Sequence, residues 1–289
     1  MLMDFLLVTS LSALVGISTL VISALGLSIT FGIMGVINMA HGEFIMIGAF
    51  VTVILTSSGV PFVLAIVCAV AAGAMLGLIV ERLLISRLYG RRIESTLLAT
   101  FGLSLVLQQA AVLLIGTTPR GIQTPFGSLA IGSYSIGWYS LLIIGIACLC
   151  VIATYLVFTR TRYGMLARAT MQNRDMAASL GVNTRWVNAT TFTLGSAFAA
   201  LAGAVLSPLL AVVPSMGLPL ISSAFMTVVL GGPAVLAGLV AASGVLGASR
   251  EIVANAVSPV LGTAALMVVA MLLLRMLPNG ISASWKRTL

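Results

Sequence analysis

The chain has 289 residues, of which 60% are apolar and 7% are charged, whereas a soluble domain averages about 25% charged residues. This composition excludes an ordinary water-soluble globule, and apolar runs of about 20 residues predict a polytopic membrane protein. Because a membrane β-barrel would show alternating segments of about 10 residues, we expect an all-α fold. The net charge of +8 comes from short basic clusters between apolar runs. We interpret these clusters as topology signals and expect no nucleic-acid partner.

The N-terminal part of the chain predicts three membrane spans. The first runs from about 5 to 25. The second ends near Ser57 and is interrupted by polar residues at 38–43, which predicts a broken helix near mid-membrane. The third covers about 62–80 and carries two glycines, four residues apart, that allow close approach of another helix backbone.

Two basic segments set the expected orientation, because cytoplasmic loops carry an excess of arginine and lysine. Between them we expect a fourth span at about 96–115 and a fifth at about 141–158. The intervening segment 117–139 is rich in Gly, Pro, Ser and aromatic residues, which suits the outer side. The cytoplasmic arginines are expected to be Arg82, Arg87, Arg91 and Arg92 in one segment and Arg160, Arg162, Arg168, Arg174 and Arg185 in the other.

The C-terminal part predicts three more apolar segments. The sixth span, about 187–212, carries small residues at four-residue spacing. The segment 221–248 is broken at Gly231-Gly232-Pro233, and a last span at about 257–277 leads to the basic tail 286–287. A cytoplasmic tail is consistent only if 221–248 is re-entrant or made of two short helices. We expect about eight apolar segments, two of them broken helices, in one transmembrane domain of residues 1–289.

The second basic segment also predicts a short amphipathic helix on the cytoplasmic face. Leu166, Ala169, Met176 and Leu180 recur at helical spacing, and Gly181 is placed to end the helix. Helices that lie on lipid headgroups, the alternative interpretation, favour bulky Trp and Phe residues, which this face lacks. A groove on another protein is the better partner, because a helix docked there could carry motion between subunits.

Polar residues at the first break are candidates for a transport pathway. Asn38, His41 and Glu43 stand together at membrane depth, which costs several kcal/mol unless they face a cavity or partners. They either line a solute route or bond carbonyl groups freed by the break. Both interpretations can hold, because broken helices in transporters line the substrate route. Gln108 in the fourth span is a further candidate.

The sequence offers little for catalysis or for a cofactor. The single histidine excludes a two-histidine metal motif, and the single lysine, Lys286, follows no glycine-rich phosphate loop. We therefore expect no catalytic residue, no metal site, no cofactor and no ATPase site in this chain.

Residues 35–44, Gly-Val-Ile-Asn-Met-Ala-His-Gly-Glu-Phe, together with Leu27 to Phe31, resemble the N-terminal signature of the permeases of branched-chain amino-acid and urea ABC importers. The stretch from Arg168 to Gly203 resembles the coupling region of the same family. The resemblance covers about 25–232. Within the family, segments 95–109 and 172–178 look closer to the urea branch than to the leucine/isoleucine/valine branch.

This resemblance implies a permease subunit, not an enzyme, in the bacterial cytoplasmic (inner) membrane, which translocates urea or branched-chain amino acids by alternating access. The implied partners are a second homologous permease subunit, two cytoplasmic ATPase subunits that hydrolyse ATP, an extracytoplasmic solute-binding protein and membrane lipid. The pathway residues implied are Asn38, His41, Glu43 and Gln108. The residues implied to couple the permease to the ATPases are Arg168, Asn173, Arg174, Asp175 and Gly181.

Two other classes of protein compete with this interpretation. An ion-gradient-driven secondary transporter or channel for a small neutral solute would use Glu43 and His41 as a proton or ion site. Its uptake would persist without ATPases. An intramembrane enzyme would need a nucleophile paired with a histidine, and the sequence shows no recognisable pairing of that kind.

Overall fold

The computed structural model describes residues 2–90, 93–124, 127–131, 134–232 and 234–284. Within these residues, seven helices are long and apolar enough to cross a membrane, and two apolar helices are shorter. The long helices are α1 (Leu2–Met34), α3 (Phe62–Leu83), α4 (Ile93–Ile115), α5 (Trp138–Arg160), α8 (Thr184–Leu206), α10 (Val235–Ala256) and α11 (Pro259–Met276). The shorter ones are α2 (His41–Ser57) and α9 (Gly217–Gly231). The predicted polytopic helical membrane protein is confirmed.

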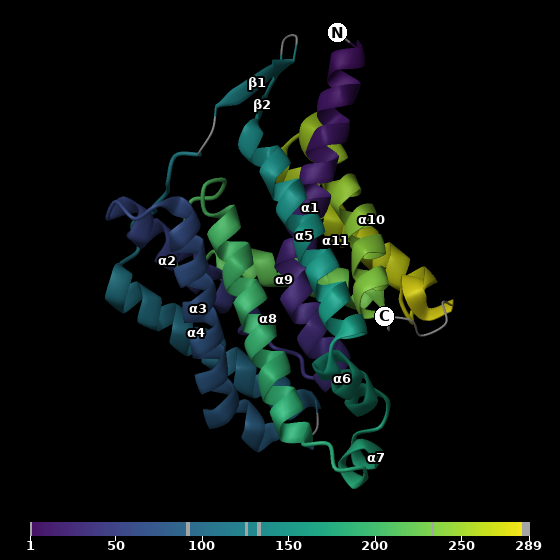
Figure 1. Cartoon of the computed structure of the whole chain (residues 1–289). Coiled ribbons are helices and arrows are strands. Elements are labelled where there is room, and N and C mark those ends of the chain that lie inside the picture. Colours follow the sequence, from purple (N-terminus) through teal and green to yellow (C-terminus); the bar gives the residue numbers. More distant parts are fainter. Residues whose placement is uncertain (1, 91–92, 125–126, 132–133, 233, 285–289) are drawn as a thin grey trace.

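Smaller elements lie at the two ends of the bundle (Figure 1). One end carries the N-terminus and a hairpin of β1 (Ser128–Ile131) and β2 (Tyr134–Gly137), which pair antiparallel where the sequence predicted only a loop. The other end carries α6 (Arg162–Gln172) and α7 (Arg174–Ser179). Two short 3₁₀ helices, η1 (Ile85–Leu88) and η2 (Ile281–Ser284), complete the described elements.

The two basic segments meet at the α6–α7 end of the bundle. The guanidinium carbon of Arg174 lies 5.1 Å from the ring centre of Tyr89, just after η1. One shared end for both segments agrees with the orientation expected from the positive-inside rule. Arg91, Arg92 and the tail 286–287 lie outside the described residues.

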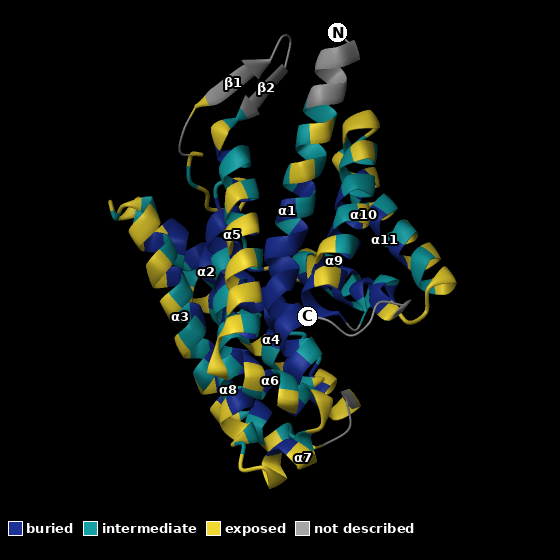
Figure 2. Cartoon of the chain, turned by 45° about the vertical axis from the view of Figure 1, so that its right-hand side comes forward, coloured by how far each residue is buried: buried dark blue, intermediate teal, exposed yellow. Residues whose placement is uncertain are grey.

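Helix α1 is the central helix, and its predicted end near residue 25 is wrong. It continues without interruption to Met34, a length of about 50 Å at ~1.5 Å per residue. Its middle is fully buried, as Figure 2 shows in dark blue. The helix ends where Gly35 adopts a φ of 64°, a conformation that glycine adopts at little cost. The break therefore separates α1 from α2 instead of dividing one span into halves.

Helix α8 packs against α1, α2 and α3 through small residues. A Cβ atom added at Gly203 would overlap the carbonyl oxygen of Ile45 in α2, and one added at Gly73 of α3 would overlap the side chain of Ala200. These contacts confirm the close approach predicted for the third span. Such packing gives dispersion contacts where lipid removes the hydrophobic driving force between helices.

The predicted segment 221–248 consists of two helices. Helix α9 ends at Gly231 and α10 begins at Val235. The Ser282 hydroxyl joins their ends, because it donates to the Gly231 carbonyl at 2.5 Å and accepts from the Ala234 amide at 3.0 Å. Pro233, part of the predicted break, lies outside the described residues. This part of the chain therefore consists of two helices, of 15 and 22 residues, of which α10 is long enough to cross a membrane.

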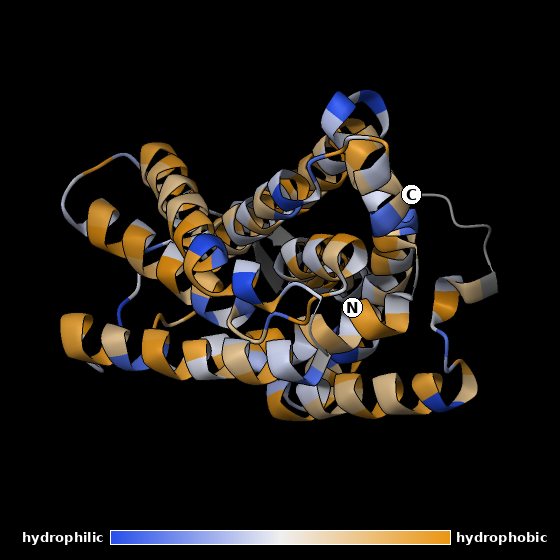
Figure 3. Cartoon of the chain, turned by 90° about the horizontal axis from the view of Figure 1, so that it is seen from below, coloured by the Kyte–Doolittle hydropathy of each residue, from blue (hydrophilic) through white to orange (hydrophobic). Residues whose placement is uncertain are grey.

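The outer helices present apolar surface. Only 17% of the most apolar windows of α4 and α11 is buried, against 72% for α1. In Figure 3, which looks along the bundle from the α6–α7 end, the outward-facing turns of the outer helices are mostly hydrophobic. A monomer with this surface needs lipid or protein around it.

We expect Gly203→Ala to destabilise the protein by ~1–3 kcal/mol, because the added methyl group overlaps the carbonyl of Ile45 and forces the helices apart. The thermal unfolding midpoint in detergent measures this. The control is Gly102→Ala in α4, where a Cβ meets nothing within 4 Å. Equal midpoints for the two variants would contradict the packing argument.

Candidate functional site

The two short apolar helices begin at the same point in the middle of the bundle. A Cβ atom added at Gly42, in the first turn of α2, would overlap the carbonyl oxygen of Gly217, the first residue of α9. We call this contact the half-helix junction. The predicted break at 231–232 lies at the opposite end of α9, so the two predicted breaks do not meet.

Glu43 lies at the half-helix junction. Its side chain is 1% exposed, and its Oε1 accepts a hydrogen bond from Ser104 Oγ at 3.0 Å. The Oε2 atom has no hydrogen-bond partner among the described residues. Because helix N-termini carry partial positive charge, the start of α2 and the nearby start of α9 both favour an acidic group here. The junction thus contains one buried carboxyl oxygen that remains free to bind.

Asn38 and His41 shape the break itself. The Asn38 side-chain oxygen accepts from the Ala40 amide at 3.1 Å, and its carbonyl accepts from the His41 amide at 3.2 Å. His41 Nε2 donates to the Ser23 carbonyl of α1 at 2.9 Å. Both side chains are buried. These contacts support the interpretation that the two residues hold the backbone of the break in place.

Helix α4 supplies residues that the sequence analysis missed. Thr100 Oγ1 accepts from the Met39 amide and contacts the Ile37 carbonyl, each at 3.1 Å. Gln108, the predicted candidate, is partly buried, and no described contact joins it to Asn38, His41 or Glu43. Thr100, Ser104 and Gln108 follow one another at four-residue spacing. That spacing is the signal that could have indicated one polar face of α4.

The predicted coupling helix is divided into α6 and α7 at Asn173. The extended backbone there (φ −157°, ψ 106°) stops α6, and the Asn173 side chain caps α7 by accepting from the Met176 amide at 2.9 Å. Gly181 has the positive φ expected of a residue that ends a helix. Arg168 donates to the Phe158 carbonyl at 2.6 Å and so caps α5.

Arg174 connects α7 to α3 through Tyr89. Its guanidinium stacks on the Tyr89 ring, and the Tyr89 hydroxyl donates to Glu81 of α3 at 2.5 Å. Burial and the Glu81 carboxylate raise the pKa of the Tyr89 phenol, so the phenol stays protonated and continues to donate. Arg174, Tyr89 and Glu81 thus form a continuous chain of contacts from α7 to α3. Asp175, beside Arg174, is exposed.

The predicted common apolar face of this region is wrong. Leu166 packs against the core of the bundle, whereas Met176 and Leu180 are 60% and 78% exposed. The division at Asn173 rotates α7 relative to α6 and so separates these residues. Two large apolar side chains therefore project from the end of the protein, away from the membrane core.

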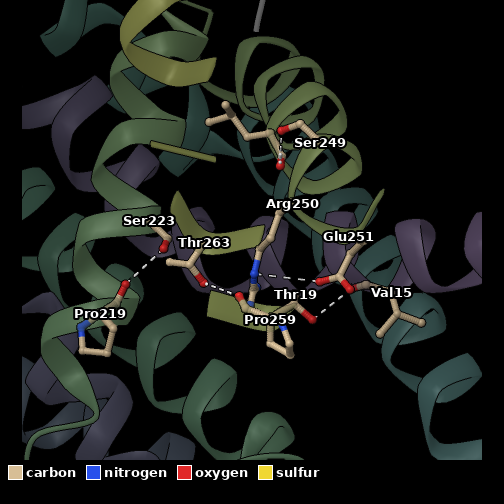
Figure 4. Close-up of polar contacts among 10 residues, drawn as sticks. Val15, Thr19, Pro219, Ser223, Ser249, Arg250, Glu251, Pro259 and Thr263 are labelled. Carbon is tan, nitrogen blue, oxygen red and sulfur yellow. Dashed lines mark hydrogen bonds and ion pairs between the residues drawn. The ribbon is translucent and has the colours of Figure 1, made fainter. Parts of the chain in front are cut away.

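A cavity of about 350 Å³ lies between α1, α9, α10, α11 and the segment 210–216. A second cavity of about 230 Å³ adjoins it, and the two share Thr19, Leu210 and Arg250. The sequence analysis missed this site because it ended the span at 248, whereas α10 continues to Ala256. Arg250 and Glu251 are therefore part of a membrane-spanning helix (Figure 4).

Comparison with known proteins decides the family. The family described as the permease component of the branched-chain amino acid transport system matches residues 9–277. The chain belongs to this family. The half-helix junction and both basic segments lie within the matched residues.

Three relatives illustrate the similarity. The permease is 29% identical over 280 residues to the high-affinity branched-chain amino acid transport system permease protein LivH of Salmonella typhimurium, covering 91% of each chain. It is 29% identical to the corresponding protein BraD of Pseudomonas aeruginosa, covering 74% of this chain and 75% of BraD. It is 25% identical to a probable LivH of Methanocaldococcus jannaschii, covering 95% and 92%. No solved structure matches the chain.

We expect Thr100→Val to destabilise the permease by ~1–3 kcal/mol, because it leaves the partly buried Met39 amide without its acceptor. The thermal unfolding midpoint measures the change. Thr154→Val is the matched control, since Thr154 is equally buried and bonds only the Cys150 carbonyl of its own helix. A midpoint for Thr100→Val no lower than that of the control would show that α4 does not hold the break.

Proposed function

We propose that the permease forms the membrane pathway of an ATP-binding cassette importer for branched-chain amino acids. The observation that supports this most strongly is the family match over residues 9–277, together with relatives of nearly equal length that are named as branched-chain amino-acid permeases. In this proposal the permease has no ATPase site, and partner subunits hydrolyse the ATP.

The half-helix junction is the proposed centre of the pathway. Two short helices meet at mid-bundle with their N-termini, and the buried backbones of Gly42 and Gly217 pack directly against each other there. In transporters, helix ends at this depth bind polar groups of the solute. The free carboxyl oxygen of Glu43 suits that role, and the hydrogen bonds of Asn38 and His41 hold the break in place beside it. Gln108 would contribute only from the outer half of α4.

The α6–α7 end is the proposed docking site for an ATPase subunit. Met176 and Leu180 offer an apolar anchor, Asp175 offers an exposed charge, and Arg174 links the anchor to α3 through Tyr89. Closure of two ATPases would move α7, and the connection to α3 would pass that motion to the helices around the pathway. Alternating access then follows as a shift between two states of the bundle.

The remaining partners follow from this arrangement. A second permease subunit would cover part of the exposed apolar surface, and lipid would cover the rest. The complex would lie in the cytoplasmic (inner) membrane of a bacterium. An external solute-binding protein would dock at the end of the permease that carries the β1–β2 hairpin.

We expect ATP-dependent uptake of labelled leucine by proteoliposomes that hold the purified complex with its solute-binding protein. Labelled urea is assayed in parallel, because segments 95–109 and 172–178 predict the urea branch. Uptake of urea alone would replace the amino-acid proposal. Uptake that persists without ATP and collapses with the ion gradient would replace the ABC mechanism with a secondary transporter or channel.

We expect Leu180→Asp to reduce ATP-driven uptake at least about tenfold. Burial of a leucine side chain at an interface contributes about 1.5–3 kcal/mol, and about 1.4 kcal/mol corresponds to a tenfold change in affinity. Co-purification of the ATPase subunits and uptake are measured together. Leu180→Met keeps the apolar anchor and serves as the control. If Leu180→Asp retains both ATPase binding and uptake, α7 is not the docking site.

A further inference from the structure

Arg250 lies in a membrane-spanning helix and lines both adjoining cavities. It lies within two turns of the end of α10 at Ala256, and its side chain is 34% exposed. Ionisable residues within membrane segments mark substrate or ion pathways. The Nε atom of Arg250 lies 3.9 Å from Glu251 Oε1 (Figure 4). This distance is that of an ion pair and is too long for a hydrogen bond. The guanidinium donors therefore remain available to a ligand.

Ser23 adds an unpartnered hydroxyl to the larger cavity. Its side chain is 2% exposed, and its Oγ has no hydrogen-bond partner among the described residues. The neighbouring hydroxyls behave differently. Thr19, Ser223 and Thr263 each donate to the carbonyl four residues earlier in their own helices (Figure 4). A buried hydroxyl without a partner is unfavourable, so Ser23 indicates a polar ligand in the cavity.

Glu251 and an apolar wall complete the surroundings of Arg250. Glu251 lines the smaller cavity, which Thr19 and Arg250 join to the larger one. The larger cavity is thus lined by a cation, Arg250, and by Ser23, and an anion, Glu251, lies beside the cation. The apolar part of its wall consists of Leu20, Leu210, Ala211, Val213, Met216 and Leu220.

We propose that this cavity is a binding site for an aliphatic α-amino acid on its way through the permease. The Arg250 guanidinium and the Ser23 hydroxyl donate to the carboxylate, Glu251 lies on the side of the ammonium group, and the apolar wall receives the side chain. Arginine suits this role because its planar fork matches the two oxygens of a carboxylate. The inference rests on the proposed import of amino acids and adds the residues that hold the solute.

The chemistry of the lining favours a zwitterion over other small solutes. Urea is neutral and would bring no charged group to the Arg250–Glu251 pair. An inorganic anion would match Arg250 but would leave the apolar wall and Glu251 unmatched. A zwitterion with an aliphatic side chain matches the Arg250 guanidinium, the neighbouring Glu251 carboxylate and the apolar wall.

The test measures leucine transported per ATP hydrolysed, in proteoliposomes that hold the whole complex, at saturating loaded solute-binding protein. We expect Arg250→Gln to lower this ratio at least tenfold while the stimulated ATPase rate persists. Ser23→Ala should lower it several-fold, and Arg250→Lys should lie between wild type and Arg250→Gln. The matched controls are Arg275→Gln in α11 and Ser222→Ala in α9, because both residues are exposed and line neither cavity.

Three outcomes overturn the inference. If Arg250→Gln and Ser23→Ala keep the ratios of their controls, the pair is structural and the cavity binds no solute. If the ATPase rate and uptake fall together with an unchanged ratio, Arg250 supports the fold alone. If the wild-type complex imports no leucine, the proposed function is wrong, and this inference, which rests on it, is wrong as well. If the Arg250→Gln variant does not assemble into the complex, the ratio of leucine transported to ATP hydrolysed is compared for Ser23→Ala and Arg250→Lys instead. A ratio equal to that of wild type in both variants then overturns the inference.

Discussion

The backbone contacts of α8 are the constraint on which the bundle depends. Gly195, Ala200 and Gly203 allow α1, α2 and α3 to approach one helix at once, and larger side chains at these positions would separate all three. Lipid tails are as apolar as the helix surfaces, so the hydrophobic effect does not drive these helices together. Their association depends on the dispersion contacts that close packing provides. The positions of the half-helix junction and of the cavities follow from it, since both are bounded by helices held around α1 and α8.

The buried polar groups discussed above fall into two sets: those that have hydrogen-bond partners and those that have none. At the break, Thr100, Asn38 and His41 pair their hydrogen-bonding groups with backbone, which gives the segment one shape. At the half-helix junction and the larger cavity, Glu43 Oε2 and Ser23 Oγ have no hydrogen-bond partners within the described residues. Satisfied groups fix the scaffold, and unsatisfied ones are available for a solute. The carbonyl of Ser23 accepts from His41, so the two sets meet on one residue of α1.

The sequence predicted the helical class, both basic segments and the polar break because hydropathy and charge reveal them directly. It failed where a boundary depends on packing. No turn signal separates 25 from 34, so the assumed span of about 20 residues ended α1 too early. The charges of Arg250 and Glu251 ended the last broken segment at 248, although the cavities accommodate both within α10. The polar face of α4 was visible at Gln108, but only tertiary contacts show that Thr100 and Ser104 are the residues used.

The burial of α1 has a consequence for biosynthesis. This helix is synthesised before the other helices of the bundle, and the Val235 carbonyl that accepts from the Ser28 hydroxyl lies 207 residues downstream. At ~5–20 residues per second, translation separates the two by on the order of 10 to 40 s. During that interval the serines and threonines of α1 have no tertiary partner from α8 or α10. The nascent chain must therefore insert α1 as an independent span or shield it beside the translocon, and assembly of the bundle begins only when the C-terminal helices arrive.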